Sequence, residues 1–291
     1  MTRLPDFIIA GVRKCGTSSV HQWLGEHPQI FVPPMTKELF FFDRLWDRGP
    51  EWYMRHFRNA PPQSICGEAT PTYFSHPEAA QRIKQTVPDV KLVFVFRNPV
   101  ERAISMYHHM ASVGETRTTF SETADRTPEL IDEGFYDRHY ARFASLFGEK
   151  ALYPFILEDV RASGKDALKP LFAFLGVDPD FVPPSLFERT YERREPRAYG
   201  LVSFVGRTTL FLRDHGLHSV VNAAKSLGVE RIFYKSNSSK PQAVTADVVA
   251  RLKKNYVDDA RRLGDRIGRD LVALWRLDAP DLSEDGGRDG T

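Results

Sequence analysis

Residues 7–19 read FIIAGVRKCGTSS. The apolar run 7–11 predicts a buried strand, a tight glycine-bounded turn follows up to Gly16, and a helix is expected to begin at Thr17 or Ser18. A strand, a short loop and a helix in this order are typical of a phosphate site, because backbone N–H groups and the positive end of the helix converge on an anion. The sequence therefore predicts a phosphate-binding loop near the start of the chain.

The loop departs from the version found in nucleoside triphosphatases. That version reads G-x-x-x-x-G-K-[ST], with a lysine directly after the second glycine. Here Gly11 and Gly16 keep the glycine spacing, but Thr17 occupies the lysine position and the lysine has moved back to Lys14. A cation inside the loop suits a nucleotide whose reactive group lies next to its 5′-phosphate, so we expect a donor other than ATP. The residues expected to bind this donor phosphate are Arg13, Lys14, Cys15, Gly16, Thr17 and Ser18.

A second phosphate-binding pattern follows the apolar run 91–96, which reads KLVFVF. A continuous β-favouring run is typical of a strand buried on both faces of a parallel sheet. The run ends at Arg97, and Pro99 is a normal start signal for a helix. Ser105 lies about two turns into that helix. Because an arginine fork and a hydroxyl both bind phosphate oxygens, Arg97 and Ser105 predict a site for a second phosphate.

Strands and helices alternate along the rest of the chain. Further strands are predicted at 65–67 and 151–157, and helices at 76–87, at 166–175 and twice between 245 and 275. The aromatic-rich stretch 33–62 is irregular but is expected to be packed. This order predicts an α/β fold with a doubly wound parallel sheet flanked by helices and the ligand at the carboxyl ends of the strands. We expect a single domain over residues 1–280 and a disordered, acidic, glycine-rich tail at 281–291.

The composition restricts the class of protein. The chain has 291 residues, 42% hydrophobic and 27% charged, and its net charge of +2 gives no reason to expect a nucleic-acid partner. Two cysteines, Cys15 and Cys66, make no disulfide framework. No apolar run approaches the roughly 20 residues that cross a bilayer, and residues 1–5 leave no room for a signal peptide before the first strand. We therefore expect a cytoplasmic protein without a membrane partner, and the oligomeric state cannot be read from the sequence.

At four places the chain resembles the sulfotransferases that use 3′-phosphoadenosine 5′-phosphosulfate (PAPS), a family with a P-loop-type fold. The loop 11–17 is similar to their 5′-phosphosulfate loop, and VFRNPVERAIS at 95–105 is similar to their 3′-phosphate motif. Between these motifs, KELFFFD at 37–43 and GEATPTYF at 67–74 are similar to the branch that sulfates heparan-type glycans and to its bacterial relatives. The resemblance keeps its spacing over residues 6–107 and is looser beyond them.

The resemblance implies transfer of a sulfuryl group from PAPS to a hydroxyl or an amine of a carbohydrate or small-molecule acceptor. By analogy with phosphoryl transfer, the protein must position the partners, stabilise the leaving oxygen and remove the acceptor's proton. Lys14 is placed to stabilise the leaving oxygen, and the resemblance assigns the base to Glu38. The alternative for Glu38 is a surface ion pair with Lys37 or Arg44. No metal is expected, because the sulfuryl group carries less charge than a γ-phosphate and no acidic pair suits Mg²⁺.

One motif departs from the family pattern. Heparan-type enzymes usually carry a lysine after the glutamate of the GE motif, where this chain has Ala69. The resemblance then leaves Lys37 or Arg13 to supply any missing positive charge. Glu68 is either a second active-site carboxylate or a structural hydrogen-bond acceptor. Three histidines near the phosphate motifs are expected to be structural: His21, His108 and His109.

Two later segments leave alternatives open. The mixed-charge run 188–197 either lines the path of an anionic acceptor or forms a solvated face with internal ion pairs. The segment 235–241 loosely resembles the late basic loop that covers the 3′-phosphate in sulfotransferases, which would bring Ser239 and Lys240 to the donor. A plain exposed loop is the alternative for this segment.

Three hypotheses for the function follow. The first is a PAPS-dependent sulfotransferase, favoured by four motifs in the right order. The second is a P-loop kinase that uses ATP, disfavoured by Thr17 in the lysine position and by the lack of an Mg²⁺-holding aspartate after a strand. The third is a nucleotide-binding module without activity, disfavoured because Lys14, Glu38, Arg97 and Ser105 occur together. Donor preference separates the first two, and turnover separates the first from the third.

Overall fold

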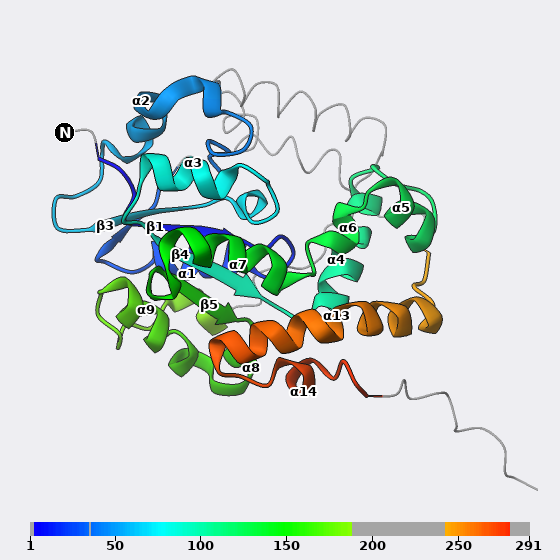
Figure 1. Ribbon diagram of the computed structural model, residues 1–291. Helices are drawn as coiled ribbons and strands as arrows, with labels where there is room; N and C mark the ends of the chain where they lie inside the picture. Colours follow the sequence, from blue (N-terminus) through cyan, green and yellow to red (C-terminus); the bar gives the residue numbers. More distant parts are fainter. Residues whose placement is uncertain (1–2, 35, 188–241, 280–291) are drawn as a thin grey trace, which may run out of the picture.

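The centre of the protein is a parallel five-stranded sheet, seen in a computed structural model that describes residues 3–34, 36–187 and 242–279 (Figure 1). The strands lie in the order β2-β3-β1-β4-β5, and every neighbouring pair is parallel. Their bounds are β1 Phe7–Gly11, β2 Ile30–Phe31, β3 Ile65–Ala69, β4 Lys91–Phe96 and β5 Leu152–Ile156. The predicted α/β class with a parallel sheet is confirmed.

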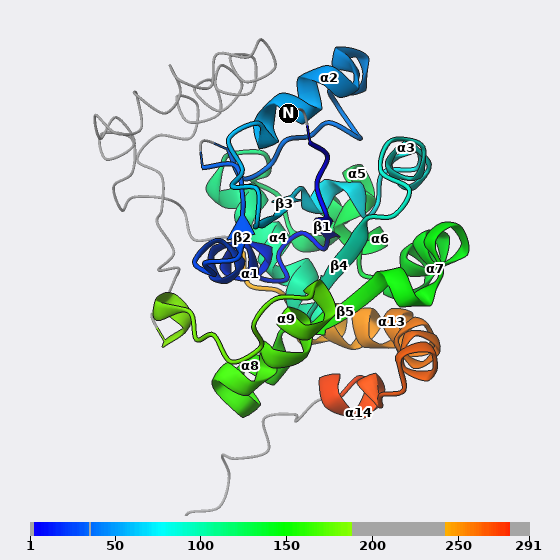
Figure 2. The same cartoon turned by 90° about the vertical axis from the view of Figure 1, so that its left-hand side faces the viewer.

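Helices cover both faces of the sheet. Figure 2 shows α1 and α9 on one side and α3 and α7 on the other, which is the doubly wound arrangement. The helices are α1 Thr17–Gly25, α2 Gly49–Met54, α3 Ala79–Thr86, α4 Pro99–Ser112, α5 Phe120–Arg126, α6 Glu129–Asp132, α7 Tyr136–Phe147, α8 Glu158–Ser163, α9 Lys169–Leu175, α13 Ala246–Ile267 and α14 Leu271–Trp275. Short 3₁₀ turns lie at Trp46–Arg48, Arg55–Phe57, Pro71–Tyr73, Glu149–Ala151, Gly164–Ala167 and Pro184–Phe187.

The central strand β1 lies between β3 and β4, where close packing requires small residues. Phe7 is in register with Gly67 on β3 and with Lys91 on β4. A Cβ on Gly67 would lie 2.0 Å from the Phe7 ring, so only glycine fits at this position. All of β4 except Lys91 is buried, as the apolar run predicts for a central parallel strand.

The predicted elements agree with the structure except at several helix and strand ends. Strands 7–11 and 91–96 and the helix start at Thr17 are confirmed. The helix predicted at 76–87 begins only at Ala79, because the amide of Glu78 bonds to the His76 ring in a turn. The helix predicted at 166–175 is a 3₁₀ turn followed by α9, which starts at Lys169 with a proline in its first turn.

The irregular aromatic stretch is packed, as predicted. Phe41, Phe42, Tyr53 and Phe57 are buried, and the rings of Phe41 and Tyr53 stack with centroids 4.7 Å apart. The mixed-charge run 188–197, the residues Ser239 and Lys240, and the tail 281–291 lie outside the described residues. Within the described part of the chain, no helix is both long enough and apolar enough to cross a bilayer.

Candidate active site

The predicted phosphate loop connects β1 to α1 through a sharp turn. Lys14 has a φ of 66° and Gly16 a φ of 89°, both in the left-handed region. This conformation costs a non-glycine residue roughly 1–2 kcal/mol, and residues held in it cluster at functional sites. Gly16 caps α1, and its carbonyl accepts hydrogen bonds from the amides of Ser19 and Val20. The first turn of α1 therefore begins directly after Gly16, at the end of the loop that follows β1.

Cys15 faces the protein core rather than solvent. Its Sγ lies 3.4 Å from the hydroxyl of Tyr136, and burial raises the pKa of the thiol to about 12. Its amide donates to the carbonyl of Val12 at 3.3 Å. The Tyr136 hydroxyl donates in turn to the carbonyl of Arg97 at 2.8 Å. Cys15 thus connects the loop to the end of β4, and its side chain is committed to that contact.

Arg13 is held by a buried carboxylate. Its Nε lies 2.8 Å and 3.0 Å from the two carboxylate oxygens of Glu133. Glu133 also accepts hydrogen bonds from Ser75 at 2.8 Å and from the fully buried Arg102 at 3.4 Å. These contacts fasten the loop to α4 and α6. The predicted contact of Arg13 with a donor phosphate would require this pairing to change.

Lys37 brings the predicted base to the phosphate loop. Its Nζ donates to Ser18 Oγ at 3.0 Å, to Thr17 Oγ1 at 3.4 Å and to Glu38 Oε1 at 3.2 Å. The ion pair between Lys37 and Glu38 that we considered as an alternative does form, but it lies at the first turn of α1. Glu38 keeps 34% of its side chain exposed, so a solvent-borne acceptor can reach its carboxylate.

The segment that follows Glu38 is fixed to residues at the end of β3. The amide of Leu39 donates to Thr70 Oγ1 at 3.0 Å, and the amide of Phe41 donates to the hydroxyl of Tyr73 at 2.9 Å. Phe40, between them, has a φ of 52°. The guanidinium of Arg44 lies 4.4 Å from the centre of the Phe40 ring, so Arg44 packs on that ring.

Glu68 is fully buried beneath this segment. It accepts hydrogen bonds from Thr70 at 2.6 Å, Tyr53 at 3.0 Å and Tyr73 at 3.1 Å. Burial raises the pKa of its carboxyl to about 7, although the three hydrogen bonds favour the ionised form. Because no part of Glu68 is exposed, the structure supports a hydrogen-bond acceptor rather than a second carboxylate that contacts the acceptor.

Arg97 and Ser105 lie along the start of α4. The side chain of Asn98 caps this helix by accepting from the amides of Val100 and Glu101 at 2.9 Å and 3.2 Å. Arg97 Nε donates to Glu101 at 3.0 Å. Glu101 and Ser105 are one turn apart, so they share a face of the helix. Arg97 thus contacts Glu101, which lies one turn before Ser105 on α4, and the site for a second phosphate at Arg97 and Ser105 stays a prediction.

Two histidines adjoin the loop. Burial, and then the charge of Lys37, lower the pKa of His21 to about 4, and its buried Nε2 has no hydrogen-bond partner among the described residues. The pKa of His109 is lowered to about 4, first by desolvation and then by the charges of Lys14 and Arg13. The residue itself remains partly exposed. Both imidazoles are therefore neutral at physiological pH.

Residues 4–192 match the protein family described as the sulfotransferase domain. The chain belongs to this family. It is 38% identical over 150 residues to human heparan sulfate glucosamine 3-O-sulfotransferase 3B1, covering 47% of this chain and 37% of that protein. It is 40% identical over 108 residues to membrane-associated sulfotransferase kil1 of Dictyostelium discoideum, covering 36% and 23%. The crystal structure of a sulfotransferase from Alicyclobacillus acidocaldarius matches with a TM-score of 0.68 and 25% identity, over 94% of this chain and 99% of that one.

The sulfotransferase family confirms the resemblance to the heparan-type branch, because several of the curated relatives are heparan sulfate sulfotransferases. This chain covers less than two fifths of the length of each of the two curated relatives named above. The P-loop kinase alternative loses its support, since both the family match and the structural neighbour are sulfotransferases.

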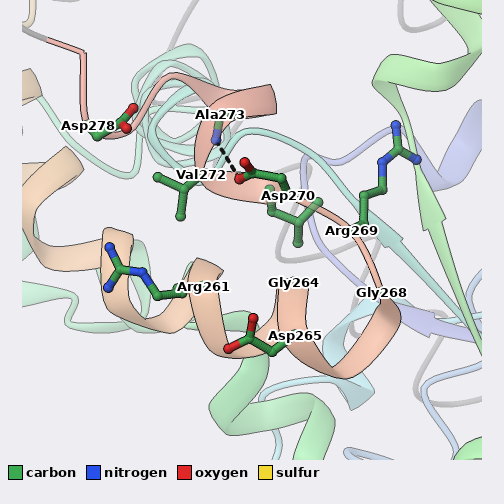
Figure 3. Close-up of a pocket in the computed structure, with 10 residues that line it drawn as sticks. Arg261, Gly264, Asp265, Gly268, Arg269, Asp270, Val272, Ala273 and Asp278 are labelled. Atoms are coloured by element: carbon green, nitrogen blue, oxygen red, sulfur yellow. Dashed lines mark hydrogen bonds between the residues drawn. The ribbon is translucent and has the colours of Figure 1, made fainter.

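A separate hollow of about 600 Å³ lies between α13 and α14 (Figure 3). Its wall includes Arg261 and Asp265, but none of its lining residues belongs to the four sulfotransferase motifs. The side chain of Asp270 at its edge is used to cap α14 by accepting from the amide of Ala273 at 2.9 Å. In residues 3–34, 36–187 and 242–279 no group of three or more metal-ligating side chains is placed to hold a metal ion.

Sequence reasoning missed the contacts that hold the sulfotransferase motifs together. The Lys37 contact with Thr17 and Ser18 joins segments twenty residues apart, and no periodicity predicts it. The support of Leu39 and Phe41 by hydroxyls also arises only in the folded protein. The repeated aromatic and hydroxyl residues of 67–74 were the one available signal.

Proposed function

We propose that the protein transfers a sulfuryl group from PAPS to a hydroxyl or an amine of a carbohydrate or small-molecule acceptor. The observation that carries this proposal is the contact of Lys37 with Glu38, Thr17 and Ser18. It places a solvent-accessible carboxylate, a cation and two hydroxyls together at the first turn of a helix. This is the set of groups that an anionic donor and a protic acceptor require.

The donor is expected to bind at two places. Amides at the start of α1, the hydroxyls of Thr17 and Ser18, and Lys14 would hold its 5′-phosphosulfate. Arg97 and Ser105 would hold its 3′-phosphate, which requires Arg97 to exchange Glu101 for the ligand. These residues fit the two anionic groups of PAPS, because hydroxyls and charge-assisted donors bind phosphate oxygens well. The contacts of Ser239 and Lys240 with the donor remain predictions.

The proposed step breaks one bond to sulfur and forms another. The acceptor oxygen or nitrogen forms a bond to sulfur while the bond from sulfur to the 5′-phosphate oxygen breaks. The electron pair of the broken bond stays on that oxygen, where Lys14 offsets the charge. The acceptor's proton goes to Glu38, and the products are the sulfated acceptor and adenosine 3′,5′-bisphosphate. No redox partner is required.

The class of acceptor follows from the relatives. Several of them are named as enzymes of heparan sulfate, so a carbohydrate hydroxyl or amine is the first choice. The partly exposed carboxylate of Glu38 is compatible with an acceptor that arrives from solvent. A cytoplasmic location is also a proposal, and fractionation of the producing cells tests it.

The test of this function uses PAPS labelled in the sulfate and a panel of acceptors that includes desulfated heparan oligosaccharides and simple phenols. We expect label on at least one acceptor, with one adenosine 3′,5′-bisphosphate formed per sulfate transferred. A Lys14→Ala variant should lose both signals. Absence of transfer to every acceptor, together with absence of bisphosphate binding, would contradict the proposal.

A further inference from the structure

Glu68 is a buried carboxylate held by hydroxyl groups. Its side chain has no exposed surface, and among the described residues its hydrogen bonds come from Thr70, Tyr53 and Tyr73. A buried carboxylate without a paired cation is costly for a protein. We therefore ask which part of the protein is held in place by the hydrogen bonds that this carboxylate accepts.

Two of the three hydroxyls continue toward Glu38. Thr70 Oγ1 donates to Glu68 and accepts from the amide of Leu39 at 3.0 Å. The Tyr73 hydroxyl donates to Glu68 and accepts from the amide of Phe41 at 2.9 Å. Each hydroxyl has one proton, so the acceptor at one end sets the direction of the whole chain. Two parallel chains of amide, hydroxyl and carboxylate therefore start directly after Glu38 and end on Glu68.

The two amides flank a residue in an unfavourable conformation. Phe40 has a φ of 52°, and the bonds from Leu39 and Phe41 fix the main chain on either side of it. A bulky residue adopts this region only where its surroundings over-determine the backbone. The turn at Phe40 sets the direction in which the chain leaves Glu38.

The third hydroxyl provides an internal comparison. The hydroxyl of Tyr53 donates to the same Glu68 oxygen as Tyr73, at 3.0 Å against 3.1 Å. Among the described contacts it makes no bond to the main chain of residues 36–43, although its ring stacks on Phe41. Tyr53 and Tyr73 thus make the same kind of bond to Glu68, and only Tyr73 extends it to the segment that carries Glu38.

We propose that Glu68 is a positioning residue that holds Glu38 at the phosphate loop through Thr70 and Tyr73. This inference rests on the proposed sulfuryl transfer for its catalytic consequence. Glu68 does not touch the donor or the acceptor. It fixes the polarity of two hydroxyls, and they fix the main chain that carries the base.

The test compares matched pairs of variants. Tyr73→Phe and Thr70→Val each break one of the two series of hydrogen bonds. Tyr53→Phe removes a hydroxyl from Glu68 and leaves both series intact, and Thr70→Ser keeps the hydroxyl at position 70. We measure kcat and KM with labelled PAPS and the best acceptor, the Kd of adenosine 3′,5′-bisphosphate by calorimetry, and hydrogen exchange of the amides in residues 36–43.

We expect Tyr73→Phe and Thr70→Val to lower kcat by about tenfold to a hundredfold, because a displacement near 1 Å of a reacting group has this effect. The bisphosphate Kd should stay close to that of the wild type, and exchange of the Leu39 and Phe41 amides should become faster. Tyr53→Phe should keep wild-type kcat and exchange, and Thr70→Ser should restore both.

Equal loss of kcat in Tyr53→Phe and Tyr73→Phe would overturn the inference, because the effect would then belong to the burial of Glu68 in general. Unchanged exchange at residues 39–41 in Tyr73→Phe and Thr70→Val would overturn it as well. Faster exchange in these two variants, in a protein whose wild type transfers no sulfate, would overturn the proposed function and would still support the link from Glu68 to this segment.

Discussion

The Nζ of Lys37 lies 3.0 Å from the Oγ of Ser18. This contact joins the segment that carries Glu38 to the first turn of α1, and the Lys37 ammonium also contacts Glu38 itself at 3.2 Å. An anionic donor bound at the loop would compete with Glu38 for this ammonium. Donor binding would then free the carboxylate for its role as a base.

Replacing Lys37 should weaken binding of the donor's 5′-phosphate. We expect Lys37→Met to raise the Kd of adenosine 3′,5′-bisphosphate by about tenfold to a hundredfold, because a charge-assisted hydrogen bond contributes roughly 1.5–3 kcal/mol. Adenosine 3′-phosphate, which has no 5′-phosphate, should lose little affinity. Calorimetry measures both, with Lys165→Met on an exposed site as the control. Equal losses for the two nucleotides would show that Lys37 does not contact the 5′-phosphate.

Replacing Glu38 should separate catalysis from donor binding. We expect Glu38→Gln to lower kcat by about 10²–10⁴, the usual contribution of a general base. The affinity for the bisphosphate should change little, since the proposed partner of this carboxylate is the acceptor and not the donor. Rates with labelled PAPS provide the measurement, and Glu51→Gln at an exposed position of α2 is the control. A Glu38→Gln enzyme that works at the wild-type rate would remove the base assignment.

The sheet was accessible from the sequence because its central strands are continuous apolar runs. Strand 91–96 matches β4 residue for residue, and the start of α1 follows from the glycine before it. The two-residue strand β2 is too short to carry a period. Helix α5 was missed although Thr119 and Glu122 form a capping box, which is a readable signal.

The candidate site was only partly predictable. The residue types of the loop and of the 91–105 segment indicated two phosphate positions. The ion pair between Arg13 and Glu133 could not be predicted, because the two residues are 120 positions apart in the chain. The same holds for Glu68, whose buried carboxylate accepts hydrogen bonds from the hydroxyls of Thr70, Tyr53 and Tyr73 in the folded protein.

Arg97 should distinguish the 3′-phosphate from the rest of the donor. We expect Arg97→Ala to weaken the binding of adenosine 3′,5′-bisphosphate by about tenfold to a hundredfold and to leave the binding of AMP almost unchanged. Glu101→Gln removes the present partner of Arg97 and should bind the bisphosphate at least as tightly as the wild type. Calorimetric titrations of both variants with the bisphosphate and with AMP measure these affinities. A similar loss for both nucleotides in Arg97→Ala would contradict the assignment.

The buried carboxyl of Glu68 should make the folded state less stable as the pH rises. Its pKa is about 7 in the folded protein against an ordinary 4.5, so the folded form retains a proton that the unfolded chain has lost between these values. The free energy of unfolding should therefore fall by about 3 kcal/mol across this interval through this group. Urea unfolding at pH 5 and pH 8 measures the change, and Glu68→Gln should show a drop smaller by that amount. Identical pH profiles for the two proteins would refute this.

The most direct test of PAPS-dependent sulfuryl transfer is a calorimetric titration with adenosine 3′,5′-bisphosphate, run beside titrations with AMP and with ATP in the presence of Mg²⁺. We expect micromolar or tighter binding of the bisphosphate, weaker binding of AMP and weak binding of ATP. Tight, Mg²⁺-dependent binding of ATP with no binding of the bisphosphate would contradict PAPS-dependent sulfuryl transfer.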